Sequence, residues 1–193
     1  MFLASTLILS SCDSKMSLSK EIEGTWASNA ESVTAPGSLN ATATYMLQFT
    51  PDRGNDPKSG NFMMMAQIGI TDMGAPDDIS IQAYSVTAAG IVSAMGQYTV
   101  TDDDEVSITM SPESFSVEVD PKAVILENNL LTGSDTPSTN DSLSTIYASH
   151  VKSRIAETFR NQFISLKKID DIEIKHDEMK CEIRDRDIFF HKQ

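Results

Sequence analysis

The sequence predicts a mainly β protein, an antiparallel meander β-barrel with one long amphipathic α-helix near the C-terminus. Three observations support this fold class. Apolar residues recur at every second position in many short stretches, which is typical of strands with one buried face. Segments rich in Gly, Pro, Asp and Asn separate these stretches and predict tight turns. One stretch near the C-terminus has the period of a helix instead.

The alternating stretches predict about nine or ten short strands, the pattern of an antiparallel barrel. Tyr45, Leu47 and Phe49 share one face, and the loop 51–60 that follows is dense in turn-forming residues. Residues 28–43 predict a loop or a weak strand, and 87–90 a turn or a bulge. The predicted strands cover 45–50, 61–70, 79–86, 91–101, 106–110, 114–119, 169–175, 179–183 and 187–191.

The helix is predicted over about 145–168. Its apolar residues are spaced four or three apart and form one stripe, Tyr147, Val151, Ile155, Phe159, Phe163 and Leu166. Most basic side chains of this stretch lie off the stripe. Ser142 or Ser144 is a candidate N-cap. We expect the stripe to close or cover the barrel.

The N-terminal residues resemble an export signal. An apolar run ends in Leu9-Ser10-Ser11-Cys12, small residues before a cleavage point, which resembles the lipobox of bacterial lipoprotein signals. The resemblance implies that Cys12 carries a diacylglycerol and that this lipid alone anchors the protein to a membrane. Since nothing before Cys12 is charged, we expect the basic part of the signal to lie upstream of an internal Met. The alternative is an apolar N-terminus with an incidental cysteine.

This interpretation divides the chain into a signal segment, 1–11, a lipidated Cys12 with a polar tether, 12–20, and a single barrel domain, 21–193, which includes the helix. The expected location is the bacterial cell envelope, with the outer membrane or the cell surface favoured over the inner membrane. The net charge of −13 argues against nucleic acid as a partner and against docking on anionic lipid.

Gly24-Thr25-Trp26 contains the only tryptophan and precedes the meander, whose hairpin spans 96–109. In this position the motif resembles the opening of the lipocalin-like (calycin) superfamily, and more narrowly small lipocalin-like lipoproteins of Bacteroidetes-type bacteria. The resemblance implies that Gly24 and Trp26 close one barrel end and that a late basic residue, Arg184 or Arg186, packs across the indole. The chain departs from the family pattern because strands follow its helix.

The ten methionines suggest an adaptable apolar interior. A ligand-binding barrel would be lined by inward-facing residues, and the candidates are Leu47, Phe49, Met64, Ile68, Ile81 and Met110. The alternative, which the pattern favours, is that the same side chains pack against one another.

No motif predicts catalysis, a metal site or a cofactor. The run 102–105 is acidic but lacks the alternating ligand spacing of a calcium loop, so a solvated hairpin tip is favoured. His150, His176 and His191 form no zinc-binding pair. Cys181 is either a reactive thiol or, as its alternation with Met179 and Ile183 favours, a buried apolar residue.

The leading hypothesis is therefore a non-catalytic, lipid-anchored, exported protein that binds a small apolar molecule or an envelope partner. The second hypothesis is a structural or interaction lipoprotein with a filled barrel and no small-molecule ligand. An envelope hydrolase is the least supported. Because fold does not fix function, the contents of the barrel decide between the first two.

Overall fold

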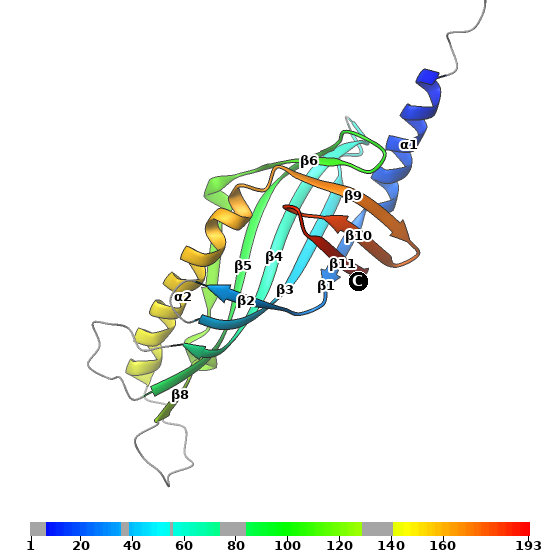
Figure 1. Ribbon diagram of the computed structural model, residues 1–193. Helices are drawn as coiled ribbons and strands as arrows, with labels where there is room; N and C mark the ends of the chain where they lie inside the picture. Colours follow the sequence, from blue (N-terminus) through cyan, green and yellow to red (C-terminus); the bar gives the residue numbers. More distant parts are fainter. Residues whose placement is uncertain (1–6, 36–38, 55, 74–83, 129–140) are drawn as a thin grey trace, which may run out of the picture.

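The computed structural model describes residues 7–35, 39–54, 56–73, 84–128 and 141–193. The fold is mainly β, as predicted, and the described residues contain one 11-stranded antiparallel sheet (Figure 1). In chain order the elements are α1 (Leu7–Glu21), β1 (Gly24–Ser28), β2 (Glu31–Ala35), β3 (Leu39–Pro51), β4 (Ser59–Met73), β5 (Tyr84–Val100), β6 (Val106–Met110), the 3-10 turn η1 (Pro112–Ser114), β7 (Ser116–Val119), the 3-10 turn η2 (Pro121–Ala123), β8 (Ile125–Asn128), α2 (Asp141–Ile164), β9 (Lys168–Lys175), β10 (Glu178–Glu182) and β11 (Asp187–Lys192).

Eight of the strands form a closed antiparallel barrel. The order around it is β1, β11, β10, β9, β6, β5, β4 and β3, and β3 pairs with β1 again. Trp26 marks the seam, since its Cα partners are Lys192 on β11 and Leu47 on β3. The barrel therefore closes through the first strand, which joins the last strand of the chain to the meander.

The long strands β3, β4 and β5 continue beyond the barrel as an open, curved sheet (Figure 1). There β2 pairs with β3, while β7 and β8 pair with β5. Helix α2 packs against β5, β7 and η2 and buries its apolar stripe completely. Gly90 makes this approach possible, because a Cβ at that position would lie 2.8 Å from Cδ1 of Ile155.

The interior at the opposite end of the long strands, beside α1, is filled with aromatic side chains. The Phe49 ring lies 5.1 Å from that of Phe62 and 5.4 Å from that of Tyr98, centroid to centroid. Ile22, just after α1, is fully buried and its carbonyl accepts a 2.8 Å hydrogen bond from Nε1 of Trp26. This half of the barrel is a packed core.

Several boundaries differ from those predicted. The long helix spans Asp141–Ile164, so its start lies before both candidate N-cap serines and its end before Leu166, which is nevertheless buried. Residues 12–20, expected as a tether, belong to helix α1, whose last turn contributes Leu18 to the core. The predicted turn at 87–90 lies inside β5, where Ala88 and Gly90 keep the inner face small enough for α2. Residues 79–83 lie outside the described residues.

Candidate functional site: an apolar cavity between the barrel and helix α2

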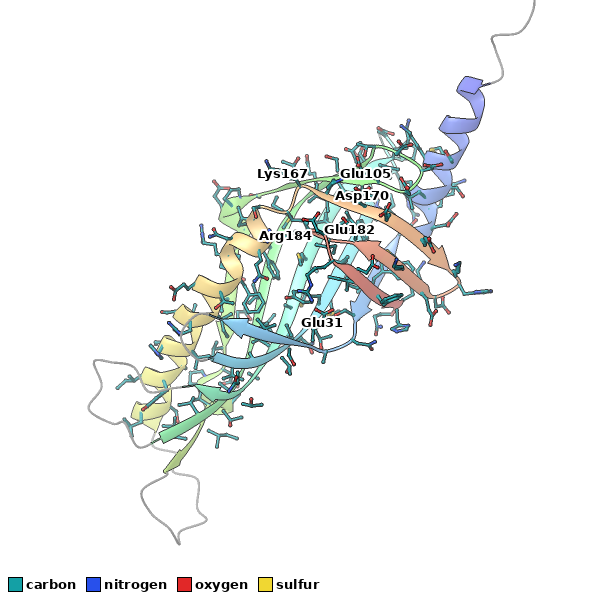
Figure 2. The ribbon with its side chains drawn as sticks, viewed as in Figure 1. Glu31, Glu105, Lys167, Asp170, Glu182 and Arg184 are labelled. Carbon is teal, nitrogen blue, oxygen red and sulfur yellow. The ribbon has the colours of Figure 1, made fainter. Side chains whose placement is uncertain are left out.

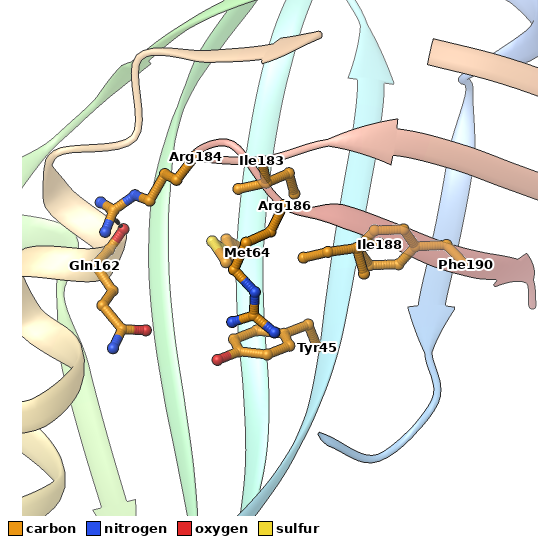
Figure 3. A pocket seen from close by; sticks show the side chains of 8 residues that line it. All are labelled: Tyr45, Met64, Gln162, Ile183, Arg184, Arg186, Ile188 and Phe190. Atoms are coloured by element: carbon orange, nitrogen blue, oxygen red, sulfur yellow. Dashed lines mark hydrogen bonds between the residues drawn. The ribbon is translucent and has the colours of Figure 1, made fainter. Parts of the chain in front are cut away.

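A cavity of about 310 Å³ opens where the β10–β11 hairpin meets the C-terminal end of α2 (Figure 3). Its walls come from β3, β4, the β10–β11 hairpin, β11 and α2. The lining residues are Tyr45, Met64, Gln162, Ile183, Arg184, Arg186, Ile188 and Phe190. The volume is at the lower end of the range of small-molecule sites, roughly 300–1,000 Å³.

The wall of the cavity is mostly apolar because alternation turns five of its residues inward. Met64, Ile183, Ile188 and Phe190 are all buried, and so is Tyr45. The backbone N–H of Tyr45 donates to Oγ of the buried Ser28 at 2.9 Å, which fixes β3 beside β1. Burial, and then the charge of Glu31, raise the pKa of the Tyr45 phenol above its usual value. Tyr45 therefore stays neutral at physiological pH.

The β10–β11 hairpin, which carries Arg184 and Arg186, has a strained turn. Arg184 and Asp185 both have left-handed backbones, with φ of 56° and 59°. The N–H of Ile183 donates to the carbonyl of Arg186 at 2.9 Å, so Arg184 and Asp185 form a two-residue hairpin loop, in which positive φ angles are common. Asn, Asp and Gly are the residues that accept a left-handed backbone most readily, so Arg184 is the strained member of this pair. Strain of this kind is a reason to look for function.

Arg184 holds the C-terminal end of α2. Its Nη2 lies within hydrogen-bond distance of the carbonyls of Asn161, at 3.0 Å, and Gln162, and of Oγ of Ser165. These carbonyls are the unpaired acceptors that every helix end leaves. Partial burial lowers the pKa of Arg184, but a guanidinium remains protonated in proteins. Figure 2 shows the side chain between β10 and α2.

Arg186, which follows the turn, pairs with Glu31 of β2 at 2.9 Å. The arginine side chain is 67% exposed and the glutamate 27%, so the pair contributes little stability. Figure 3 shows Arg186 reaching from the hairpin towards Tyr45.

Only one of the predicted ligand-contacting residues, Met64, lines this cavity. Leu47, Phe49, Ile68 and Met110 are buried in the packed core, and Ile81 lies outside the described residues. Four of the six candidates are therefore buried side chains that do not line this cavity. The sequence analysis missed Gln162, Ile188 and Phe190 as lining residues, because they meet only after α2 and the last hairpin have docked.

The structure corrects part of the prediction for the residues that close the barrel end. Trp26 is fully buried, and Gly24 has a φ of 118° that favours glycine. The cation over the indole is Lys192, whose Nζ lies 5.0 Å from the ring centroid. The prediction of Arg184 or Arg186 as that partner is wrong, because both turn away to α2 and β2. Sequence spacing alone could not identify Lys192 as the partner of the indole, because the pairing of β1 with β11 is what brings Lys192 beside Trp26.

Cys181 is fully buried, as the alternation favoured, and burial raises its pKa to about 12. The backbone at Cys12 is helical, and its side chain lies outside the described residues. The structure, over the residues it describes, contains no cluster of three or more His, Cys, Asp or Glu side chains that could hold a metal ion. No helix in the described ranges combines the length and the hydropathy needed to cross a membrane.

A second hollow, of about 550 Å³, lies on the outer face of β3, β4, β5 and β7. Thr42, Gln67, Glu118 and Asp120 are among its walls, and it is more open to solvent than the inner cavity. A small apolar molecule would keep more of its surface in water there. The inner cavity is therefore the better candidate site.

No protein-family model matches this chain, and no curated protein matches it.

Proposed function

We propose that this chain is an exported, lipocalin-like lipoprotein that binds a small apolar molecule without transforming it. The supporting observation is the cavity of about 310 Å³ whose walls include Met64, Ile188 and Phe190. Displacing water from such walls favours an apolar guest by roughly 25 cal/mol per Å² of buried surface. The proposed lipid on Cys12 would hold the barrel at an envelope membrane.

The interior also supports the second hypothesis, an interaction lipoprotein without a small ligand. Phe49, Phe62 and Tyr98 fill the barrel beside α1, and Met95 and Ile91 expose apolar surface on the outer face, with Met95 56% exposed. A partner protein could cover such a patch. The cavity at the other end of the barrel makes ligand binding the leading proposal.

Native mass spectrometry of the protein purified from its own host tests both halves of the proposal. We expect a mature chain that starts at Cys12, with the added mass of acyl chains, and a retained small molecule that dissociates on unfolding. Replacing Cys12 by Ser should abolish the acyl mass and release the protein from the membrane fraction. An unmodified chain would contradict the anchor.

Filling the cavity tests the site itself. Ile188→Trp places an indole in the space, so binding of an apolar fluorescent probe, 1-anilinonaphthalene-8-sulfonate, should fall by roughly tenfold or more. The matched control is Ile91→Trp, because Ile91 is 41% exposed on the outer face. Equal binding by both variants would place the probe elsewhere and count against this cavity.

A further inference from the structure

Four methionines gather on the outer face of the barrel, where β3, β4 and β5 run side by side (Figure 1). Met46 on β3 pairs with Met65 on β4, and Met63 on β4 pairs with Met95 on β5. We call these four residues the methionine square. Side chains directly opposite on antiparallel strands have Cβ atoms about 5 Å apart, and those two positions apart on one strand about 7 Å. The four thioethers therefore lie within reach of one another.

The methionine square is open to solvent. Met95 is 56% exposed, and the other three side chains are half-buried. The packed interior lies on the opposite face of the same strands, the face of Met64 and Ala94. The outward residues that flank the square on its three strands are polar and uncharged, Thr44, Gln48, Asn61, Gln67, Ser93 and Gln97. A hard cation, which prefers carboxylate oxygens, finds no such ligand among them.

The backbone of Met95 is held firmly. Its N–H donates to Oγ of Ser114 at 2.7 Å, and its carbonyl accepts from that hydroxyl at 2.9 Å and from the N–H of Ser111 at 2.9 Å. The next residue, Gly96, lies so close to β6 that an added Cβ would be 2.3 Å from the carbonyl oxygen of Thr109. Met95 is thus fixed beside Met63, and a ligand set on a rigid support loses less entropy when it binds.

The choice of methionine at all four positions indicates that the sulfur is used. Ile and Val suit a strand better, and Leu or Ile provides similar apolar surface at a smaller cost in side-chain entropy. The inner faces of the same strands do contain such residues, for example Leu47, Ile68 and Val92. An apolar surface alone would not require methionine at each position of the square.

We propose that the methionine square binds a soft monovalent cation, copper(I), through its thioether sulfurs. Thioethers belong to the soft ligands that select copper(I), whereas carboxylates, carbonyls and water suit magnesium and calcium. The flexible methionine side chains can turn several sulfurs towards one ion on the open face. This site is separate from the apolar cavity, and it goes beyond the proposed function because it requires neither the small ligand nor the lipid.

Calorimetric titration with silver(I) tests the site, because silver(I) shares the preference of copper(I) for sulfur and is stable in air. The titrated chain carries Cys12→Ser, which removes a competing thiol, while Cys181 is fully buried. We expect one ion per chain, and Met63→Leu should weaken binding by roughly tenfold or more. Leu conserves volume and apolar character, so this variant removes only the sulfur. Met16→Leu is the control, because its half-buried thioether lies on α1 instead of the sheet.

Two results of this titration would overturn the inference. One is a parent chain that does not bind silver(I). The other is Met63→Leu binding silver(I) as tightly as the parent, which would leave the square as an apolar surface for a partner protein. Thermal unfolding of each variant, followed by circular dichroism, establishes that the compared proteins are folded.

Nuclear magnetic resonance of protein labelled with ¹³C in the methionine methyl groups identifies the ligands. The ε-methyl signals of Met63, Met65 and Met95 should shift with silver(I), and with copper(I) under a reductant, while those of the buried Met64 and Met110 stay in place. Shifts confined to methionines outside the square would refute the assignment.

The pH dependence separates thioethers from histidines. A thioether has no proton to lose, so the affinity for silver(I) should stay constant between about pH 5 and 8, whereas a histidine site weakens as its imidazole is protonated. A steep loss of affinity towards pH 5 would assign the ion to a histidine and overturn the inference.

Discussion

At the scale of single residues, Gly24, Trp26 and Lys192 form the contact that joins the first strand to the last. Lys192 passes over Gly24, where an added Cβ would lie 3.3 Å from its Cε, and places its ammonium over the indole. Nζ also lies 3.4 Å from the carbonyl of Glu21. One side chain thus ties β11 to both β1 and the end of α1.

Replacing Lys192 by Met tests this contact. The variant keeps most of the apolar stem and loses the cation, so we expect the free energy of unfolding to fall by about 0.5–1 kcal/mol. Urea denaturation followed by tryptophan fluorescence measures the change. Lys175→Met is the control, because Lys175 is 80% exposed and pairs only with its neighbour on the strand, Glu173. Equal losses in the two variants would argue against the cation–π contact.

The second residue-scale prediction concerns Cys181. Its pKa of about 12 in the folded state lies above the ordinary value of 9.0, because burial disfavours the thiolate. Above the ordinary pKa the unfolded chain loses this proton first, so stability falls as the pH rises from about 9 towards 12. Cys181→Ala should flatten this part of the pH dependence of the urea midpoint. In a Cys12→Ser background, 5,5′-dithiobis(2-nitrobenzoic acid) should label the thiol only on unfolding.

At the scale of elements, α2 stabilises the open part of the sheet, which would otherwise expose the inner faces of β5 and β7. Phe159 is fully buried on its stripe and lies 6.2 Å from Phe163, centroid to centroid. Phe163 in turn contacts Phe115, which precedes β7. The helix is therefore a structural layer of the fold as well as one wall of the cavity.

Phe159→Ala should lower the free energy of unfolding by about 3–5 kcal/mol, the usual loss for a large core aromatic. The control is Ile146→Ala on the same helix, whose side chain is 50% exposed and should lose less than about 1 kcal/mol. Chemical denaturation followed by far-ultraviolet circular dichroism compares them. Similar losses in the two variants would show that the stripe is not the packed face.

The sequence predicted these elements to unequal degrees. The alternation in β3 and β4 and the stripe of α2 depend on residues close in the chain, so their faces were predicted correctly. The position of the cavity and the partner of Trp26 depend on how β10, β11 and α2 dock, which involves residues far apart in the sequence. Arg184 and Arg186 were therefore selected for a role at the indole, although they lie at the cavity.

At the scale of the whole molecule, closure depends on the last strand. Strand β11 joins β10 to β1, and the N–H of Gln193 donates to the carbonyl of Thr25 at 2.9 Å. Without β11, both β10 and β1 would present unpaired edges. Contacts between such distant parts of the chain also slow folding, since a long loop must close before they form.

A chain that ends at Arg186 should consequently fail to form a stable monomer. We expect loss of the cooperative thermal transition and association through the exposed edges, measured by circular dichroism and size-exclusion chromatography. A chain that ends at Lys192 is the control, because it loses only Gln193. A stable, monomeric product from the shorter chain would mean that the seam is dispensable.

The left-handed turn also determines which stabilising substitutions this hairpin accepts. Gly at position 185 suits the φ of 59° better than Asp, so this exchange should raise the melting temperature. Asn at position 184 would suit the turn as well, but it would lose the contacts of Arg184 with the end of α2. Engineering for heat resistance can therefore use one of the two turn positions, while the other is reserved for anchoring the helix.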